Sequence, residues 1–520
     1  MDTIINTKER AFKNISYSLL SFGWPVIIAI VITPIIVHYF GIKEYGIYIF
    51  ISTLISLVGL LDLGISTAVG KFIASYHGGN NIEGLRNLFK TANSIFFVVG
   101  IVGALSIISS IFLALNFFPS ELIGSYREYI PAFIYGGILF FINSMNALNI
   151  IIPTVYQRFD IKTKIGIPFV TIQQLLILGV VFMQWSINAL FFIQALLMFF
   201  FYFIYRHYTK KILGPVERSF LGMYGWDMKE AFNCYKFGLI SFLNDLAGSS
   251  LTYLDRMIIP LFLGPSNLTF YSLPGSVTNK IPTFSNTLSS VVFPMTAHFE
   301  GGGNRDMTKN LYIRSMRLIT IISTAITVSF IAFAYQMLQY WISSNVADKA
   351  TNVLIILAVT NFILAVTVPL SNFLLGMGKL RMLSITSAMT AILNAVLLII
   401  LLPRFGIVGA AWAYLLALVP YIFLMYKTEK HYLELTFRRA HYLKLITQLF
   451  VTSALVFLVD VFIVKPIVSS FLLVILALMF SCVLFVVIHY LFGFFEKEDT
   501  YDILSFTKQA FVTLGGHLKK

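Results

Sequence analysis

Long apolar segments constrain this chain more than any other feature of its sequence. Two of them run from Phe96 to Phe118 and from Ile467 to Phe492. A transmembrane helix needs about 20 apolar residues, whereas a strand of a transmembrane barrel needs about 10. With 58% hydrophobic and only 12% charged residues, the chain has more apolar surface than a soluble core of its length could bury. The sequence therefore predicts an all-α bundle surrounded by lipid.

The N-terminus and the two cysteines suggest neither a cleaved signal nor a covalent framework. Residues 1–14 are polar and charged, and the first apolar run lacks a cleavage pattern, so we expect no removable secretory signal. The two cysteines, Cys234 and Cys482, lie far apart in the sequence. They indicate neither a disulfide framework nor a thiolate metal site.

Apolar windows predict about fourteen transmembrane helices, joined by connections that alternate in charge. The predicted centres are Ile28, Leu60, Val102, Phe140, Leu176, Leu196, Leu251, Ser289, Ile326, Leu364, Leu393, Leu415, Leu455 and Leu478. One set of connections carries most of the Lys and Arg, which by the positive-inside rule makes that set cytoplasmic and places both termini inside. The net charge of +14 therefore reflects topology and anionic lipid headgroups, and we expect no nucleic-acid partner.

Residues recur between the two halves of the chain at one fixed offset, which predicts an internal duplication. The pairs are Gly41 with Gly264, Tyr48 with Tyr271, Gly78 and Gly79 with Gly301 and Gly302, Asn81 with Asn304, and Asn87 with Asn310. Six helices in each copy would make the copies parallel, with a pseudo-two-fold axis along the membrane normal, as in many secondary transporters. We expect an N-terminal six-helix lobe (1–205), a cytoplasmic linker (206–233), a C-terminal six-helix lobe (234–430), and an appended helix pair with a cytoplasmic tail (431–520).

Polar residues in the seventh and eighth predicted spans follow helical spacing and therefore share helix faces. In the seventh they are Ser241, Asn244, Asp245, Gly248, Ser249, Thr252, Asp255 and Arg256, and in the eighth Asn279, Lys280, Pro282, Thr283, Asn286 and Ser290. A tight helix–helix contact explains the small residues, but it does not require Asp245 or Arg256. A water-filled cavity is the simpler interpretation of the eighth span, because ionisable groups in lipid are costly.

Three further spans carry polar groups, and the groups of two of these spans have two interpretations each. In the second span Asp62 and Ser66 share a face, while Lys71 points to the opposite side and either reaches the headgroups or lines a cavity. In the fourth span a run of amides, Asn143, Asn146 and Asn149, either binds sugars or bridges helices. Asp460, in the appended pair, is expected to be interfacial.

The embedded cations predict the chemistry of a bound substrate. Lys71, Arg256 and Lys280 suit a phosphate group, because Lys and Arg make charge-assisted hydrogen bonds to phosphate. A carboxylate could instead carry a coupling H⁺ or bind Na⁺. The candidates for polar cavity or coupling-ion residues are Asp62, Asp245, Asp255, Asn143, Asn146, Asn244, Asn279 and Asn286.

Enzymatic motifs are absent from the sequence. It contains no Gly-rich phosphate loop, no His or Cys pairs at metal-ligand spacing and no set of catalytic Ser, His and Asp that the topology would bring together. We therefore expect no enzyme, no metal and no cofactor beyond a coupling ion. The outer loops are also too short for a membrane glycan polymerase or acyltransferase.

Five segments together resemble the polysaccharide-unit flippases of the multidrug/oligosaccharidyl-lipid/polysaccharide exporter superfamily. They are PIIVHYFGIKEYGIY (34–48), GLLDLGISTAVGK (59–71), LDRMIIPLFLGPSNLTFY (254–271), PLSNFLLGMGKLRMLS (369–384) and LPRFGIVGAAWA (402–413). They occur in the family's order, and together they extend from the first to the twelfth span. The family's Asp-Arg pair matches Asp255 and Arg256, whereas Lys71 stands where the family often has Arg.

The resemblance implies two six-helix lobes around a cationic central cavity that opens to alternate sides of the bacterial inner membrane. The implied substrate is an undecaprenyl-diphosphate-linked oligosaccharide for O-antigen or capsule, with membrane lipids, a polysaccharide polymerase and glycosyltransferases as partners. Two alternatives from the same superfamily stay open: a lipid II flippase, which also has fourteen helices, and a cation-coupled multidrug exporter, which usually has twelve.

Overall fold

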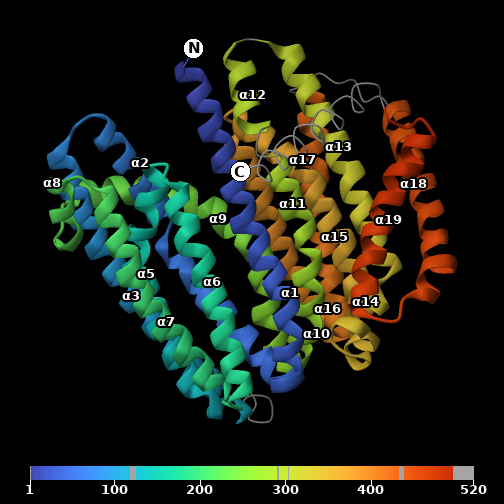
Figure 1. Cartoon of the computed structure of the whole chain (residues 1–520), viewed down its shortest axis with the longest axis horizontal. Coiled ribbons are helices and arrows are strands. Elements are labelled where there is room, and N and C mark those ends of the chain that lie inside the picture. The colour runs from blue at the N-terminus through green and yellow to red at the C-terminus, as the bar shows by residue number, and fades with distance from the viewer. Residues whose placement is uncertain (1, 118–123, 290–291, 303, 432–438, 496–520) are drawn as a thin grey trace. The chain divides into compact units, whose positions relative to one another are not determined.

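The computed structural model is built of helices throughout the part of the chain that it describes (Figure 1). It describes residues 2–117, 124–289, 292–302, 304–431 and 439–495, and no strand occurs within these ranges. The predicted all-α fold class is confirmed. The chain divides into two compact units, Met1–Thr269 and Phe270–Lys520. The four-part division predicted from the sequence stays a prediction.

Long helices dominate the first unit. Its elements are α1 (Asp2–Val58), η1 (Gly59–Asp62), α2 (Ile65–Gly78), α3 (Ile82–Phe117), η2 (Gly124–Tyr129), α5 (Ile130–Val155), α6 (Phe159–Phe182), α7 (Ile187–Ile212), α8 (Pro215–Arg218), η3 (Ser219–Gly222) and α9 (Met228–Leu263). The next helix, α10 (Pro265–Thr278), crosses the boundary between the units.

The second unit contains shorter helices followed by three long helices and the appended pair. Its elements are α11 (Lys280–Ser289), α12 (Val292–Gly301), α13 (Arg305–Ala332), α14 (Ala334–Trp341), α15 (Ser344–Gly376), α16 (Leu380–Ala417), α17 (Val419–His431), α18 (Arg439–Val459), η4 (Asp460–Val464), η5 (Lys465–Ile467) and α19 (Phe471–Leu491). The element η4 is a π-helical turn.

Ten helical stretches in the described part of the chain are long and apolar enough to cross a membrane. The two longest, Gly23–Asp62 and Arg381–His431, each contain two of the predicted span centres. The predicted centres Leu251 and Ser289 lie outside these stretches, in α9 and α11. Those two helices carry the polar residues noted above. The ten apolar stretches make the chain a multi-pass membrane protein, and the count of fourteen spans stays a prediction.

The predicted duplication has matching backbone features in the two copies. Gly41 breaks α1 with φ 81° and ψ 169°, and Gly264 ends α9 with φ 82° and ψ 166°. This left-handed region favours glycine over any residue with a Cβ. The Asn81 side chain accepts a hydrogen bond from the Gly84 N–H, and Asn304 accepts one from the Met307 N–H. The paired residues thus perform the same local task at the start of α3 and of α13.

Each unit has its own buried apolar cluster. In the first unit α2, α3 and α5 pack together with Phe220, Leu221 and Cys234, which follow α7 in the chain. In the second unit α12, α13, α15, α16 and α17 surround Tyr312 and Phe373. A further cluster joins α13 to the appended helices α18 and α19, which lie beside α13 in Figure 1.

Candidate functional site

The predicted Asp-Arg pair lies in the second half of α9. Asp255 is buried, with 1% of its surface exposed, whereas Arg256 is half-buried. The Arg256 guanidinium lies within electrostatic range of the Tyr45 hydroxyl on α1. Adjacent residues on this helix therefore differ in their access to a ligand. The side chains of Asn244 and Asp245, also predicted for this face, lie outside the described residues.

Asp62 and Lys71 lie on different elements, because Leu63 and Gly64 have positive φ and separate η1 from α2; the prediction that they point to opposite sides of one helix stays a prediction. The Ser66 N–H donates to both carboxylate oxygens of Asp62, at 3.1 and 3.3 Å, which satisfies a backbone donor at the start of α2. Lys71 is exposed, and its Nζ lies 3.8 Å from the centroid of the Phe237 ring on α9. This geometry is a cation–π contact.

Helix α2 and the first half of α9 run antiparallel in close contact. The Tyr76 hydroxyl donates to Glu230 at 2.8 Å, Lys71 lies over Phe237, and the backbones approach closely at Gly64 and Gly238. Sequence reasoning missed Glu230 and Phe237, because neither belongs to the polar stripe of α9. Only a contact between helices far apart in the sequence identifies them.

Lys71 and Arg256 do not meet at one point. Phe237, which Lys71 contacts, and Arg256 lie on the same helix, and nineteen residues at 1.5 Å per residue separate them by roughly 28 Å along its axis. A single diphosphate cannot span that distance. Within the first unit the cations therefore mark two levels along α9, as expected of a path rather than of one phosphate-binding cluster.

The second unit exposes three predicted residues around the start of α11. Asn279 and Lys280 lie at the junction of α10 and α11, and Asn286 lies two turns further on. On the opposite face of α11 the buried Ser285 forms a hydrogen bond with Ser323 of α13 at 3.2 Å. The helix therefore buries one face in the protein and leaves its amides and its lysine accessible.

The amides of α5 divide between two environments. Asn143 is exposed, whereas Asn146 and Asn149 are buried. The Asn149 side-chain amide donates to the side-chain oxygen Oδ1 of Asn146 at 3.1 Å. The Asn149 backbone carbonyl also accepts a hydrogen bond from Thr209 of α7. The side-chain hydrogen bond lies within α5, so neither amide is seen to bridge helices. Burial makes Asn146 and Asn149 inaccessible and leaves Asn143 the better candidate for a ligand.

The segment that joins α7 to α9, residues 206–233, is fixed to the first unit by hydrogen bonds. The Asn93 amide donates to the carbonyl oxygens of Leu221 and Met223, at 3.3 and 3.0 Å. The Gly225 N–H donates to the Ser94 hydroxyl at 2.8 Å, and the Asp227 N–H donates to Thr91 at 3.0 Å. The predicted linker is thus a folded part of this unit.

A second group of contacts holds the α8 end of the same segment. Glu217 lies 3.1 Å from the His77 ring and 3.2 Å from the Tyr156 hydroxyl, and it also accepts a hydrogen bond from the Gly214 N–H. Burial and the neighbouring Glu217 carboxylate raise the pKa of Tyr156. The Tyr156 hydroxyl therefore keeps its proton and remains a hydrogen-bond donor to Glu217.

Replacing Asn93 with Ala is expected to loosen this segment. The change removes the donor to the Met223 carbonyl oxygen and one of the two donors to the Leu221 carbonyl oxygen, which Arg206 also reaches, at an expected cost of about 1–3 kcal/mol. Limited proteolysis of membrane vesicles should then cut within residues 206–233 faster than in the native protein. Asn87→Ala, on the same helix, is the control and should leave the cutting rate unchanged. Equal rates for the two variants would contradict the role of Asn93.

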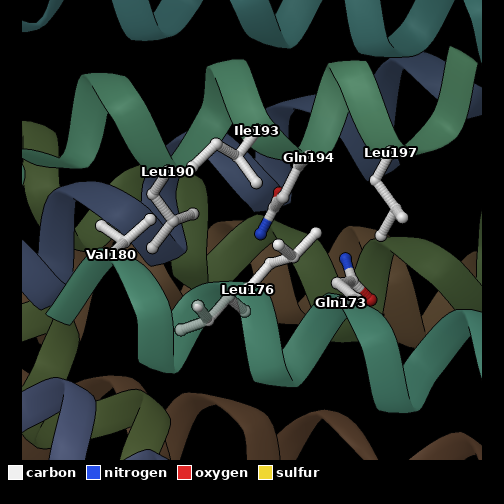
Figure 2. A pocket seen from close by; sticks show the side chains of 8 residues that line it. Gln173, Leu176, Val180, Leu190, Ile193, Gln194 and Leu197 are labelled. Atoms are coloured by element: carbon white, nitrogen blue, oxygen red, sulfur yellow. The ribbon is translucent and has the colours of Figure 1, made fainter. Parts of the chain in front are cut away.

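A small pocket between α6 and α7 is the cavity shown in Figure 2. Apolar side chains line it apart from Gln173 and Gln194, and the space between them does not admit a water molecule. It contains no cation and is too small for a lipid-linked sugar. Among the described residues no group of three or more His, Cys, Asp or Glu could hold a metal ion.

A family model described as MatE matches residues 241–400, the region that includes the Asp255–Arg256 pair and α11. Two relatives each align over 185 residues. One is a Haloferax volcanii protein named as a flippase of low-salt glycan biosynthesis, Agl15 (24% identical, 36% of this chain and 39% of the relative). The other is a Shigella flexneri protein described as an O-antigen transporter (21% identical, 34% of this chain and 44% of the relative). The matches thus cover less than half of either relative.

Solved structures show the same fold over most of the chain. One is the lipid II flippase MurJ in an inward closed conformation, with a TM-score of 0.67 and 15% identity, covering 92% of this chain and 99% of that one. Another is an inward-facing multidrug resistance MATE transporter of the MOP superfamily, with a TM-score of 0.62 and 13% identity, covering 80% and 96%. The predicted resemblance to this exporter superfamily is confirmed, and the fold is that of its transporters.

Proposed function

We propose that this protein is a flippase that moves undecaprenyl-diphosphate-linked oligosaccharide units from the cytoplasmic to the outer leaflet of the inner membrane. The single observation that carries the proposal is the pair of relatives named for glycan flipping and for O-antigen transport. The placement of the cations supports it. Lys71, Arg256 and Lys280 are each accessible in part, and ionisable groups within membrane spans usually face a cavity or a partner.

In this proposal the lobes open alternately to the two sides of the membrane, and the cations bind the diphosphate in succession. The termini and residues 206–233 are cytoplasmic. Glycosyltransferases build the lipid-linked oligosaccharide inside the cell, and a polysaccharide polymerase receives it outside. An H⁺ or Na⁺ gradient supplies the energy, with Asp62 and Asp245 as the carboxylates considered for the coupling ion.

A lipid II flippase is the second candidate, and the MurJ comparison, which covers nearly all of that structure, favours it. Its substrate is also a lipid-linked sugar on a diphosphate, so the same cations would serve. A multidrug exporter has support of the same kind, a shared fold.

Deletion of the gene separates these functions. We expect the lipid-linked unit to accumulate in the inner leaflet while surface polysaccharide is lost, and expression of the native chain should restore export. Unchanged polysaccharide with no accumulated unit would refute the proposal. Accumulated lipid II with cell lysis would support the second candidate, and drug sensitivity with normal polysaccharide would support an exporter.

A further inference from the structure

A buried polar chain connects the appended helices to α13. The Ser329 hydroxyl of α13 donates to the Ser481 hydroxyl of α19 at 2.8 Å, and the Ser481 hydroxyl donates to Asp460 Oδ2 at 2.5 Å. All three side chains have 0% of their surface exposed. The expectation that Asp460 is interfacial is therefore wrong, because the carboxyl group lies inside the protein at the contact of three helices.

The Asp460 carboxyl group has one satisfied oxygen and one unsatisfied oxygen. Oδ2 receives the Ser481 hydrogen bond, while Oδ1 is buried with no hydrogen-bond partner in the structure. No ion pair to Asp460 occurs within the described residues. An ionised carboxylate buried without a cation costs several kcal/mol, and such groups neutralise instead. The geometry thus fits a carboxylic acid better than a carboxylate.

The elements that contact η4 are α13, α18, α19 and η5. Cys482 of α19 lies within electrostatic range of Asp460, Lys465 follows η4 directly in η5, and His489 lies further along α19. Cys482 contacts Ser329, with Sγ and Oγ 3.5 Å apart, and His489 lies two turns along α19, where its ring contacts Thr452 at 3.1 Å. Residues 318–332 of α13 carry no charge at all.

The packing of α18 and η4 against α19 does not by itself require an acid at position 460. Thr452, Val456 and Asp460 follow one another at four-residue intervals, opposite His489, Phe485 and Ser481, and all six side chains are fully buried. A neutral amide at position 460 would keep the hydrogen bond from Ser481 and fill the same space. Asp460 also begins the π-helical turn η4, and such turns are frequent at functional sites.

We propose that Asp460 is a proton-binding site in the appended helix pair, occupied in the resting protein. The proton resides on Oδ1, and Oδ2 remains the acceptor for the Ser481 hydroxyl. This inference does not depend on which substrate the protein moves, since the site lies on α19, η4 and α13 and includes none of the proposed phosphate-binding cations.

Infrared difference spectroscopy on the full chain in liposomes at neutral pH tests the site. The native protein should show the carbonyl stretch of a protonated carboxylic acid that is missing from Asp460→Asn. Asp306→Asn, which changes an exposed aspartate at the start of α13, is the matched control and should leave that band unchanged. An identical acid band in native protein and Asp460→Asn would show that Asp460 is ionised, and would overturn the proposal.

Ser481→Ala provides a second, independent variant. It keeps the acid but removes the hydrogen bond to Oδ2, so the same band should remain and shift to higher frequency. The Asp460→Asn protein should also melt at the temperature of the native protein, because the amide preserves the packing. If Asp460→Asn does not fold, the band shift in Ser481→Ala decides the question, and an unshifted band would exclude a protonated Asp460 bonded to Ser481.

Discussion

Replacing Arg256 with Ala is expected to reduce transport of the lipid-linked substrate by about ten- to a hundredfold. A hydrogen bond to a charged group contributes about 1.5–3 kcal/mol, and 1.4 kcal/mol corresponds to a factor of ten. The Arg256 side chain is only half-buried, so its loss should leave the amount of protein in the membrane nearly unchanged. Lys280→Ala should act in the same direction. The measurement is the flipping rate of a lipid-linked oligosaccharide in proteoliposomes, normalised to inserted protein.

The neighbouring residue is the natural control for this experiment. Asp255 is 1% exposed, so Asp255→Asn should lower the amount of inserted protein as well as the rate. Arg256→Lys should retain part of the activity, because it keeps the charge but loses the bidentate geometry. If Arg256→Ala disappeared from the membrane as Asp255→Asn does, Arg256 would be a structural partner of the nearby aspartates.

Gly64→Val should remove most of the folded protein. A Cβ at position 64 would lie 2.3 Å from the Gly238 carbonyl oxygen, and the backbone there has φ +72°. The left-handed conformation costs a residue with a side chain about 1–2 kcal/mol, and overpacking adds about 1–3 kcal/mol. Against a total stability of about 5–15 kcal/mol, we expect a severalfold fall in the detergent-stable fraction, measured by fluorescence size-exclusion chromatography.

Gly59→Ala is the matched control for Gly64→Val. It lies in the same short connection between α1 and α2, and no atom lies within 4 Å of a Cβ added there. This variant should be inserted and extracted like the native protein. If Gly64→Val behaved the same way, the close approach of α2 to α9 would not exist in the membrane.

The helical bundle could be predicted from the sequence because it leaves local traces, and the duplication, which stays a prediction, leaves traces of the same kind. Apolar runs identify helices, and a residue needed for a particular backbone shape recurs wherever that shape recurs. Gly41 and Gly264 show this, since both have nearly the same φ and ψ. Asn81 and Asn304 show it again as helix caps.

The features that could not be predicted from the sequence depend on contacts between segments far apart in the chain. Asp460 looked interfacial because Lys465 follows it closely, and only the approach of α19 and α13 buries it. Phe237 is an ordinary apolar residue in the sequence, and its contact with Lys71 depends on the antiparallel packing of α2 and α9. Spacing along a helix gives the face on which a residue lies, but not the neighbour of that face.

The anchored segment between α7 and α9 has a consequence for biosynthesis. Phe220, Leu221 and Cys234 complete the apolar cluster that α2, α3 and α5 begin. During translation those three helices emerge first, so part of their buried surface stays open until the ribosome has passed residue 234. The nascent first half should therefore depend on insertion factors for longer than a self-sufficient six-helix lobe would. A chain split before position 214 should yield two fragments that assemble poorly.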